Sequence, residues 1–229
     1  QLSGEGRRWT GVPADRPVKL YTFFRSGTSH RLRIALNLKG LRYEQVAVDL
    51  RREQHLSDDY RKINPQQFVP ALDIGGLILT QSPAIIEWLE ERHPLPALLP
   101  ADADERAQVR ALAAIVGCDI HPVNNRRILE ALRNRFGADD AAVNEWCGMW
   151  IGAGFDAFPA VFPAHGRPGP FAFGERPTLA DVYLVPQIES ARRFKVDISR
   201  WPRLAAVDEA CGGLDAFQRA APAAQPDAA

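Results

Sequence analysis

The sequence has few residues of several kinds, and each shortage excludes a class of protein. Its 229 residues include one methionine and three cysteines. The cysteines, Cys118, Cys147 and Cys211, are too few and too scattered for a disulfide framework or a zinc cluster. We therefore expect no metal site, and a reducing compartment such as the cytoplasm fits best.

Net charge and long apolar runs are also missing. Lys plus Arg and Asp plus Glu both number 28, so the formal net charge is zero. No electrostatic field then favours nucleic acid or an anionic membrane, and a small molecule is the expected partner. No apolar run approaches the roughly 20 residues that span a bilayer, and no signal peptide opens the sequence. The sequence predicts neither a membrane span nor export.

Hydrophobic residues, at 46% of the chain, are plentiful enough for one large domain or two small ones. The two ends of the chain differ in composition from the rest. Residues 1–17 are rich in Gly, Pro, Arg and Asp and start at Gln1, so we interpret them as a disordered extension or an expression remnant. The Ala- and Pro-rich residues 222–229 predict a loose tail.

Residues 18–93 alternate between strand and helix patterns. In order, the patterns lie at 18–24 (strand), 28–39 (helix), 43–48 (strand), 51–63 (polar loop with a short helix), 71–74 and 77–80 (strands) and 82–93 (helix). Gly75-Gly76 between the last two strands suits a two-residue hairpin. The predicted order is βαβ followed by ββα, in an α/β domain.

The remaining residues contain helix patterns only. Residues 94–103 are rich in proline and predict a linker. Beyond it we expect an all-α domain over 104–221, with helices near 104–135, 139–162, 178–194, 202–210 and 214–220.

The turn Ser26-Gly27-Thr28-Ser29 lies where the first strand gives way to a helix. A helix start offers unpaired N–H groups and partial positive charge, which stabilise an anion and lower the pKa of a nearby thiol. Gly27 allows close approach of the backbone, and the hydroxyls of Ser26 and Thr28 can donate to sulfur. Taken alone, these residues are explained more simply as an ordinary capped turn.

Two later dipeptides carry groups suited to a peptide ligand. A cis bond at Val69-Pro70 would turn the Val69 backbone outward, so that a peptide could pair with it as an extra strand. Gln81 and Ser82 offer an amide, a hydroxyl and helix-start N–H groups, which suit a carboxylate. By itself Pro70 is weak evidence, and helix capping alone would explain Ser82.

In this order the segments resemble the thioredoxin-like half of a glutathione transferase followed by its helical half, over residues 18–220. Residues 26–36 resemble the zeta-class motif, usually Ser-Ser-Cys-Ser-x-Arg-Val-Arg-Ile-Ala-Leu, and residues 64–72 and 81–87 match that class closely. Gly27 and Thr28 replace the second Ser and the Cys of the motif. The resemblance implies the glutathione transferase fold, glutathione as cofactor and a homodimer, with Ser26 and Thr28 as candidates for contact with sulfur.

Residues 25–31 and 118–127 further resemble those of bacterial glutathione-dependent maleylpyruvate isomerases. This implies conversion of maleylpyruvate to fumarylpyruvate during gentisate or salicylate breakdown, and maleylacetoacetate is the alternative substrate. A conjugating or dehalogenating transferase is a rival hypothesis. A non-enzymatic binding or dimerisation module is another, because fold alone does not settle function.

Isomerisation of a conjugated cis double bond needs a reversible nucleophile, because thiolate addition gives a single bond that can rotate. The dicarboxylate keto acid calls for arginine, whose planar fork and permanent charge suit carboxylates. Candidates for substrate binding are Arg25, Arg126, Arg127 and Arg193, of which Arg25 and Arg193 rank first. The alternative for each is a solvated surface charge, which we accept for Arg192.

Three further polar residues are candidates for glutathione binding. His121 and Asn125 lie four positions apart on one predicted helix face, where Pro122 predicts a kink. By resemblance they bind glutathione or orient the substrate. His55 in the polar loop is placed to reach the glycyl carboxylate, and an exposed histidine is its alternative interpretation.

Two features receive structural interpretations. Thr178 to Asp181 fits a capping box that serves stability. The three cysteines fit buried apolar positions and not nucleophiles. The thiolate is therefore expected to be held by hydroxyl and backbone donors, without a protein thiol.

Overall fold

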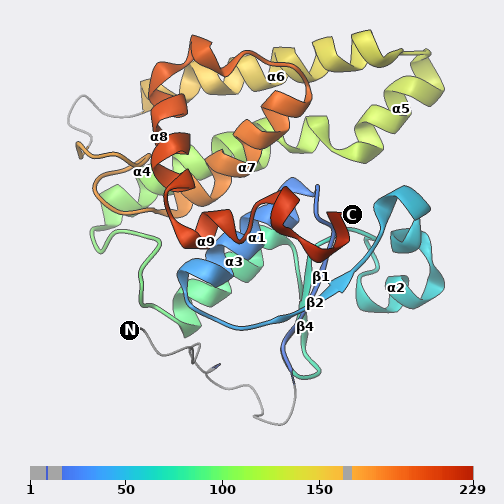
Figure 1. Ribbon diagram of the computed structural model, residues 1–229, viewed down its shortest axis with the longest axis horizontal. Coiled ribbons are helices and arrows are strands. Elements are labelled where there is room, and N and C mark those ends of the chain that lie inside the picture. Colours follow the sequence, from blue (N-terminus) through green and yellow to red (C-terminus); the bar gives the residue numbers. More distant parts are fainter. Residues whose placement is uncertain (1–8, 10–16, 162–166, 229) are drawn as a thin grey trace. The chain divides into compact units, whose positions relative to one another are not determined.

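The structure, a computed structural model, describes residue 9 and residues 17–161 and 167–228. The chain divides into two units (Figure 1). The first runs to Ala97 and resumes at Leu214, whereas the second runs from Leu98 to Gly213.

The first unit is a four-stranded sheet with helices. Its elements up to residue 97 are β1 (Lys19–Thr22), α1 (Gly27–Leu38), β2 (Glu44–Ala47), the 3₁₀ turns η1 (Leu50–Arg52) and η2 (Gln54–Leu56), α2 (Asp58–Ile63), β3 (Ala71–Asp73), β4 (Ile78–Thr80) and α3 (Ser82–Arg92). The strand order is β2-β1-β3-β4, in which β1 and β2 are parallel and the other pairs antiparallel. The predicted βαβ and ββα order is confirmed.

The helices of this unit lie to either side of the strands in Figure 1. Helices α1 and α3 pack against each other on one side, and α2 lies on the other. The α1 helix buries Leu32, Ile34 and Leu36 completely. It ends at Leu38, and Gly40 follows with a φ of 68°, the left-handed conformation that favours glycine after a helix. This fixes where the chain turns back into β2.

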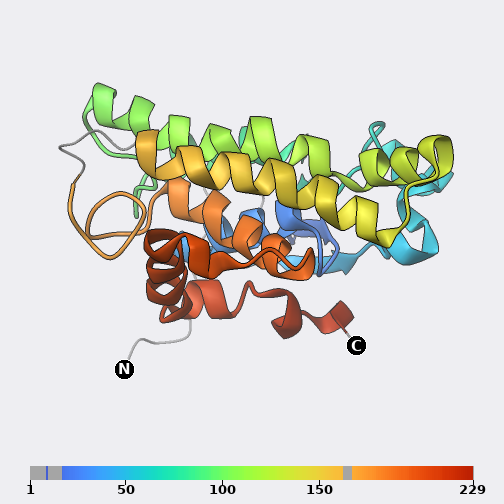
Figure 2. The same cartoon turned by 90° about the horizontal axis from the view of Figure 1, so that it is seen from above.

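The second unit is helical, as predicted. Its elements are α4 (Ala103–Ala114), the π-helical turn η3 (Ile115–Ile120), the 3₁₀ turn η4 (Pro122–Asn124), α5 (Arg126–Phe136), α6 (Asp140–Val161), α7 (Leu179–Arg193), the 3₁₀ turn η5 (Ile198–Arg200) and α8 (Pro202–Gly212). Figure 2 shows α4, α6 and α7 side by side, in green, yellow and orange. The predicted end of the second helix of this region, at 162, lies outside the described residues.

The long helix expected over 104–135 is interrupted. Pro122 has no N–H, and its ring clashes with the preceding turn, so the chain passes from α4 through η3 and η4 before α5 begins. Asn125 has extended backbone angles, φ −65° and ψ 147°. The expectation that His121 and Asn125 share one helix face is therefore wrong.

The end of the chain differs from the expected loose tail. The helix expected near 214–220 is present as α9 (Asp215–Gln218), whereas the tail forms the 3₁₀ turns η6 (Pro222–Ala224) and η7 (Pro226–Ala228) and belongs with α9 to the first unit. In this tail, the side-chain oxygen of Gln225 accepts a hydrogen bond of 3.1 Å from Gln45 of β2, and Asp227 accepts one of 2.9 Å from the Phe24 N–H. Composition misled the prediction, because these contacts join residues far apart in sequence.

Most of the expected N-terminal extension, residues 1–8 and 10–16, lies outside the described residues. Trp9 is described, and its indole N–H donates a hydrogen bond of 2.7 Å to the Arg42 carbonyl. Its ring stacks on Trp88, with 6.3 Å between centroids. Trp9 is thus held against the first unit.

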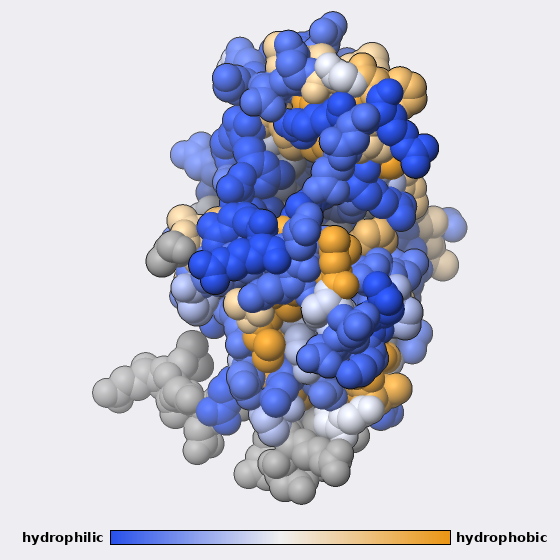
Figure 3. Space-filling view, turned by 90° about the vertical axis from the view of Figure 1, so that its right-hand side faces the viewer, coloured by the Kyte–Doolittle hydropathy of each residue, from blue (hydrophilic) through white to orange (hydrophobic). Residues whose placement is uncertain are grey.

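The sequence predicts neither a membrane span nor a metal site. On the face shown in Figure 3, hydrophobic side chains form small groups among hydrophilic ones. Among the described helices none has the length and apolarity to cross a membrane. Nor do the described residues contain a group of three His, Cys, Asp or Glu side chains placed to bind a metal.

The expectation for the cysteines holds at two of three positions. Cys147 and Cys211 are buried, and burial raises the pKa of both thiols, that of Cys147 to about 11. Cys118 is exposed, which corrects the prediction, because the irregular π-helical turn leaves it facing solvent. Buried thiols with raised pKa stay protonated, so Cys147 and Cys211 are not nucleophiles.

Candidate functional site

The turn between β1 and α1 has the geometry of a capped helix start. The Ser26 N–H donates to the Phe23 carbonyl at 3.1 Å, and the Ser26 hydroxyl accepts from the Ser29 N–H at 3.2 Å. Within the described part of the chain, the N–H groups of Gly27 and Thr28 have no acceptor. Two amide donors at the start of a helix are therefore available to an anion.

The two hydroxyls of this turn are not equivalent. Thr28 Oγ1 donates to the Val69 carbonyl at 2.9 Å and lies 3.0 Å from Ser26 Oγ. Because the Thr28 proton is used in the bond to Val69, the proton between the two hydroxyls comes from Ser26. Ser26 can turn this proton toward an incoming sulfur without breaking the bond to Val69. The structure thus favours Ser26 as the sulfur donor and Thr28 as its support.

The Val69-Pro70 peptide bond is cis, as the sequence suggested. Tyr60 and Asn64 each donate a side-chain hydrogen bond of 2.7 Å to the Phe68 carbonyl. These two bonds fix the backbone of the residue before Val69. The Val69 N–H has no acceptor among the residues described. It is available to pair with the backbone of a peptide ligand.

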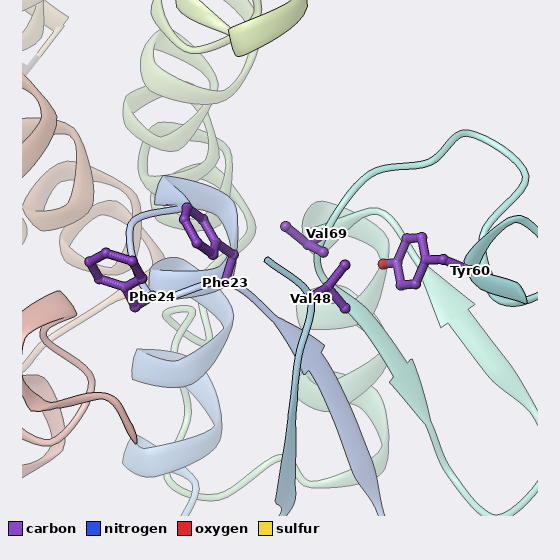
Figure 4. Packing of buried hydrophobic residues seen from close by; sticks show 5 residues of the cluster. All are labelled: Phe23, Phe24, Val48, Tyr60 and Val69. Carbon is purple, nitrogen blue, oxygen red and sulfur yellow. The ribbon is translucent and has the colours of Figure 1, made fainter. Parts of the chain in front are cut away.

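Apolar side chains support both segments. Figure 4 shows Phe23 and Phe24 on the connection between β1 and α1, with Val48 and Val69 between them and Tyr60. These five residues form one buried cluster. The segments that carry Thr28 and Val69 are therefore joined by this hydrophobic cluster as well as by a hydrogen bond.

The start of α3 is a second place for an anion. Gln81 is the N-cap residue, with a φ of 67°, and Ser82 is the first helical residue, which corrects the expectation that Ser82 caps the helix. Ser82 is 2% exposed, and its hydroxyl accepts a hydrogen bond of 3.3 Å from Arg31. The proton of the Ser82 hydroxyl is consequently left for a ligand carboxylate.

Gln81 is held in place from outside the helix. Its amide nitrogen donates a hydrogen bond of 2.6 Å to the side-chain oxygen of Gln66. This bond fixes the residue whose unusual backbone angles start α3. His55, the remaining candidate of this unit, lies half-buried on η2 between β2 and α2.

The candidates of the second unit lie near its helix interruption. His121 ends the π-helical turn, and the Asn125 side chain caps α5 by accepting from the Arg127 N–H at 3.2 Å. Arg126 forms an ion pair with Glu130, and Arg127 is exposed.

Arg192 and Arg193 at the end of α7 are both exposed, but their contacts differ. Arg192 forms an ion pair of 2.6 Å with Asp208, as its interpretation as a surface charge requires. Arg193 donates 3.0 Å to the Ser190 hydroxyl, and its guanidinium lies 5.2 Å from the Phe194 ring centroid. Arg25 similarly lies 5.8 Å from the Phe24 centroid. Both guanidinium groups therefore lie beside an aromatic ring.

The capping box at the start of α7 is present as predicted. Asp181 accepts from the Thr178 N–H at 2.7 Å and from the Ala172 N–H at 2.7 Å. Asp181 is fully buried, which suits a role in folding.

Sequence reasoning missed two buried arginines of α1. Arg31 and Arg33 are 2% and 0% exposed, and they hold Ser82 and the β1–α1 turn respectively. The sequence does indicate their burial, since Arg33 stands within the apolar run Leu32 to Leu36 and Arg31 directly precedes it, where a surface charge is not expected. Asp227, which contacts the Phe24 N–H, gave no such signal.

A model of the glutathione S-transferase N-terminal domain matches residues 16–91. A maleylpyruvate isomerase from Ralstonia sp. is 68% identical over 212 residues, which are 93% of this chain and all of that protein. The chain belongs to the glutathione S-transferase family. Within it, the holo structure of a maleylpyruvate isomerase described as zeta-class is 69% identical, with a TM-score of 0.90 over 92% of this chain and 100% of that one.

A second solved relative carries a bound ligand. The maleylacetoacetate isomerase of Anaeromyxobacter dehalogenans holds dicarboxyethyl glutathione and citrate in its active site. It is 42% identical, with a TM-score of 0.82 over 95% of this chain and 96% of that one. These similarities confirm the zeta-class resemblance and the predicted fold. They leave the individual site residues of this glutathione S-transferase as predictions.

Proposed function

We propose that this protein is a glutathione-dependent cis–trans isomerase of maleyl-type keto acids that converts maleylpyruvate to fumarylpyruvate. The observation that carries the proposal is the β1–α1 turn, where the Ser26 hydroxyl and two N–H groups lie at a helix start that is hydrogen-bonded through Thr28 to the Val69 carbonyl. The likeness to maleylpyruvate isomerases over nearly the whole chain supports the choice of substrate.

The described residues fit glutathione group by group. Ser26 and the N–H groups of Gly27 and Thr28 suit a thiolate, because donors at a helix start lower the pKa of a thiol. The Val69 N–H suits the peptide backbone of the cysteinyl residue.

The two carboxylate ends of glutathione have candidates as well. Ser82 and the start of α3, backed by the Arg31 charge, suit the γ-glutamyl carboxylate. His55, and in the second unit His121 and Asn125, complete the candidates for glutathione binding.

Bound glutathione supplies a reversible thiolate, whose addition converts the conjugated double bond into a single bond that rotates before elimination. The turn keeps the sulfur ionised by donating hydrogen bonds to it. Arg25 and Arg193, with Arg126 and Arg127 as further candidates, hold the two carboxylates of the keto acid. Because both carboxylates are held, the double bond stays positioned for addition of the thiolate and, after rotation, for elimination of the same thiolate.

The direct test follows maleylpyruvate absorbance with and without glutathione, while free thiol is counted at the end. The proposal expects glutathione-dependent isomerisation with the thiol count unchanged. Consumption of glutathione in proportion to turnover would replace it with a conjugating or dehalogenating transferase. Turnover of maleylacetoacetate alone would change the substrate and keep the reaction class.

Two further parts of the proposal come from resemblance to the family. A homodimer is expected and is tested by the mass of the native protein in sedimentation equilibrium. A cytoplasmic location agrees with three isolated cysteines. A protein that binds no glutathione in calorimetry would instead be a binding module with this fold.

A further inference from the structure

The last residues of the chain contact the turn that carries Ser26. One carboxylate oxygen of Asp227 accepts a hydrogen bond of 2.9 Å from the Phe24 N–H, across 203 positions of sequence. Phe24 stands two residues before Ser26, and the Phe23 carbonyl accepts from the Ser26 N–H. Asp227 therefore fixes the backbone that closes the turn.

Arg33 holds the same turn from the α1 side. Its guanidinium donates to Thr22 Oγ1 at 3.0 Å, to the Phe23 carbonyl at 3.4 Å and to the Phe24 carbonyl at 3.0 Å. It also donates 3.0 Å to the Ala220 carbonyl. One buried arginine thus joins the turn to the C-terminal segment.

Charge strengthens this arrangement. Burial lowers the pKa of Arg33 to about 10, and the charges of Tyr43 and Asp227 oppose the decrease, so Arg33 stays protonated at neutral pH. The guanidinium of Arg51 lies 5.4 Å from the Phe24 ring centroid. Its pKa is raised by its hydrogen bond to Asp49 and further by the charges of Asp49 and Asp227. Asp227 thus acts electrostatically on two arginines that contact the turn.

The segment that presents Asp227 is itself anchored. Gln225 is 5% exposed and donates hydrogen bonds of 2.8 Å and 2.7 Å to the carbonyls of Arg219 and Ala221. Its side-chain oxygen accepts from Gln45 of β2 at 3.1 Å. Ala228 packs against the cluster of Phe23, Phe24, Val48, Tyr60 and Val69. Asp227 thus sits between two anchored neighbours, which gives its carboxylate a fixed position.

We propose that Asp227 is a positioning residue for the thiolate-binding turn. It contacts neither the sulfur nor the substrate, and it acts by fixing Phe24 and hence the direction of the Ser26 hydroxyl and the Gly27 and Thr28 N–H groups. A hydrogen bond to a charged acceptor is among the stronger ones in proteins, so its loss lets the turn relax. This inference rests on the proposed function, since it assumes that glutathione binds at the turn.

The test compares Asp227→Ala and Asp227→Asn with Asp215→Ala, all in the full-length protein at 25 °C. Asp215 is a matched control, because it lies in the same C-terminal segment and its ion pair with Arg219 is exposed. Two quantities are measured: the Kd for glutathione by calorimetry, and the pKa of the bound thiol by thiolate absorbance.

Asp227→Ala is expected to weaken glutathione binding by about tenfold and to raise the pKa of the bound thiol. Asp227→Asn keeps an acceptor oxygen and should bind within about threefold of the unaltered protein. Asp215→Ala should match the unaltered protein in both the Kd for glutathione and the pKa of the bound thiol. Unchanged affinity and thiol pKa in Asp227→Ala, with only a lower Tm, would reduce Asp227 to a structural anchor and overturn the proposal.

If Asp227→Ala does not fold, Asp227→Glu supplies the same comparison, because one added methylene displaces the carboxylate from the Phe24 N–H. A binding loss of a few fold supports the proposal, and unaltered affinity overturns it. Failure of the unaltered protein to bind glutathione would instead overturn the proposed function, so the two failures are distinguishable.

Discussion

Thr28 Oγ1 donates a hydrogen bond to the carbonyl of Val69, 41 positions later in the chain, at 2.9 Å. The bond joins the helix start, which carries the N–H groups proposed for sulfur, to Val69, whose own N–H is proposed for the peptide backbone of the ligand and which precedes the cis bond to Pro70. Two segments that were separate candidates in the sequence are thereby held in one relative position. We expect the proposed glutathione site of the first unit to depend on this bond.

Thr28→Val should weaken glutathione binding by a few fold while leaving kcat less affected. Valine keeps the shape of threonine but leaves the Val69 carbonyl without its hydroxyl partner, so the two segments lose their mutual fixation. Titration calorimetry and steady-state kinetics measure the two effects. A large loss of kcat with unchanged Kd would mean that Thr28 itself contacts the sulfur.

Ser82→Ala should raise the Kd for glutathione by about tenfold, because the variant removes one hydroxyl donor and one acceptor of Arg31. Cysteinylglycine, which lacks the γ-glutamyl group, is the control ligand. Its affinity, measured by competition, should be the same in both proteins. Equal losses for both ligands would place Ser82 away from the γ-glutamyl carboxylate.

Arg193→Ala should raise KM for the keto acid by about tenfold or more, because an arginine–carboxylate contact is lost. The neighbouring Arg192→Ala is the matched control, since Arg192 is already paired with Asp208. It should change KM by less than about twofold. Glutathione affinity should be the same in both variants. Equal KM values for the two variants would contradict the assignment of Arg193 to substrate binding.

His30 should make the protein less stable in acid. Burial, together with the Arg33 charge, lowers the pKa of His30 to about 3 in the folded protein, against about 6.5 when unfolded. Because the unfolded chain binds the extra proton, this contribution is complete above about pH 6.5 and decreases as pH falls toward 3. Linkage then predicts about 2 kcal/mol less stability at pH 5 than at pH 8.

The measurement is urea unfolding of the unaltered protein and His30→Leu at both pH values. Among the described residues His30 Nε2 has no hydrogen-bond partner, so leucine leaves no polar group stranded. The pH-dependent difference between the two proteins should be close to the predicted 2 kcal/mol. Identical pH dependence would show that His30 is not held neutral in the fold.

Local patterns in the sequence predicted much of this molecule. Gly75-Gly76 marked the hairpin, and Thr178 to Asp181 marked the capping box of α7. Each is set by residues within a few positions of one another. The turn at Ser26 was likewise visible, because strand and helix patterns meet there.

Contacts between distant residues could not be predicted in this way. The bonds from Arg33 to Ala220 and from Phe24 to Asp227 join positions 187 and 203 residues apart, and nothing in the Ala- and Pro-rich tail indicates them. The π-helical turn before His121 was also missed, because its apolar spacing resembles that of an α-helix. The sequence also could not distinguish the roles of the Ser26 and Thr28 hydroxyls, because that distinction depends on the hydrogen bond from Thr28 to the distant Val69 carbonyl.

The most direct test of the account is the pKa of the glutathione thiol bound to Ser26→Ala, measured by thiolate absorbance. Ser57→Ala is the control, because Ser57 caps α2 through the same kind of hydrogen bond and both variants lose a cap of about 1 kcal/mol. We predict a clearly raised thiol pKa and a kcat lower by roughly 10²-fold in Ser26→Ala only. An unchanged thiol pKa in Ser26→Ala would contradict the assignment of this turn as the thiolate site.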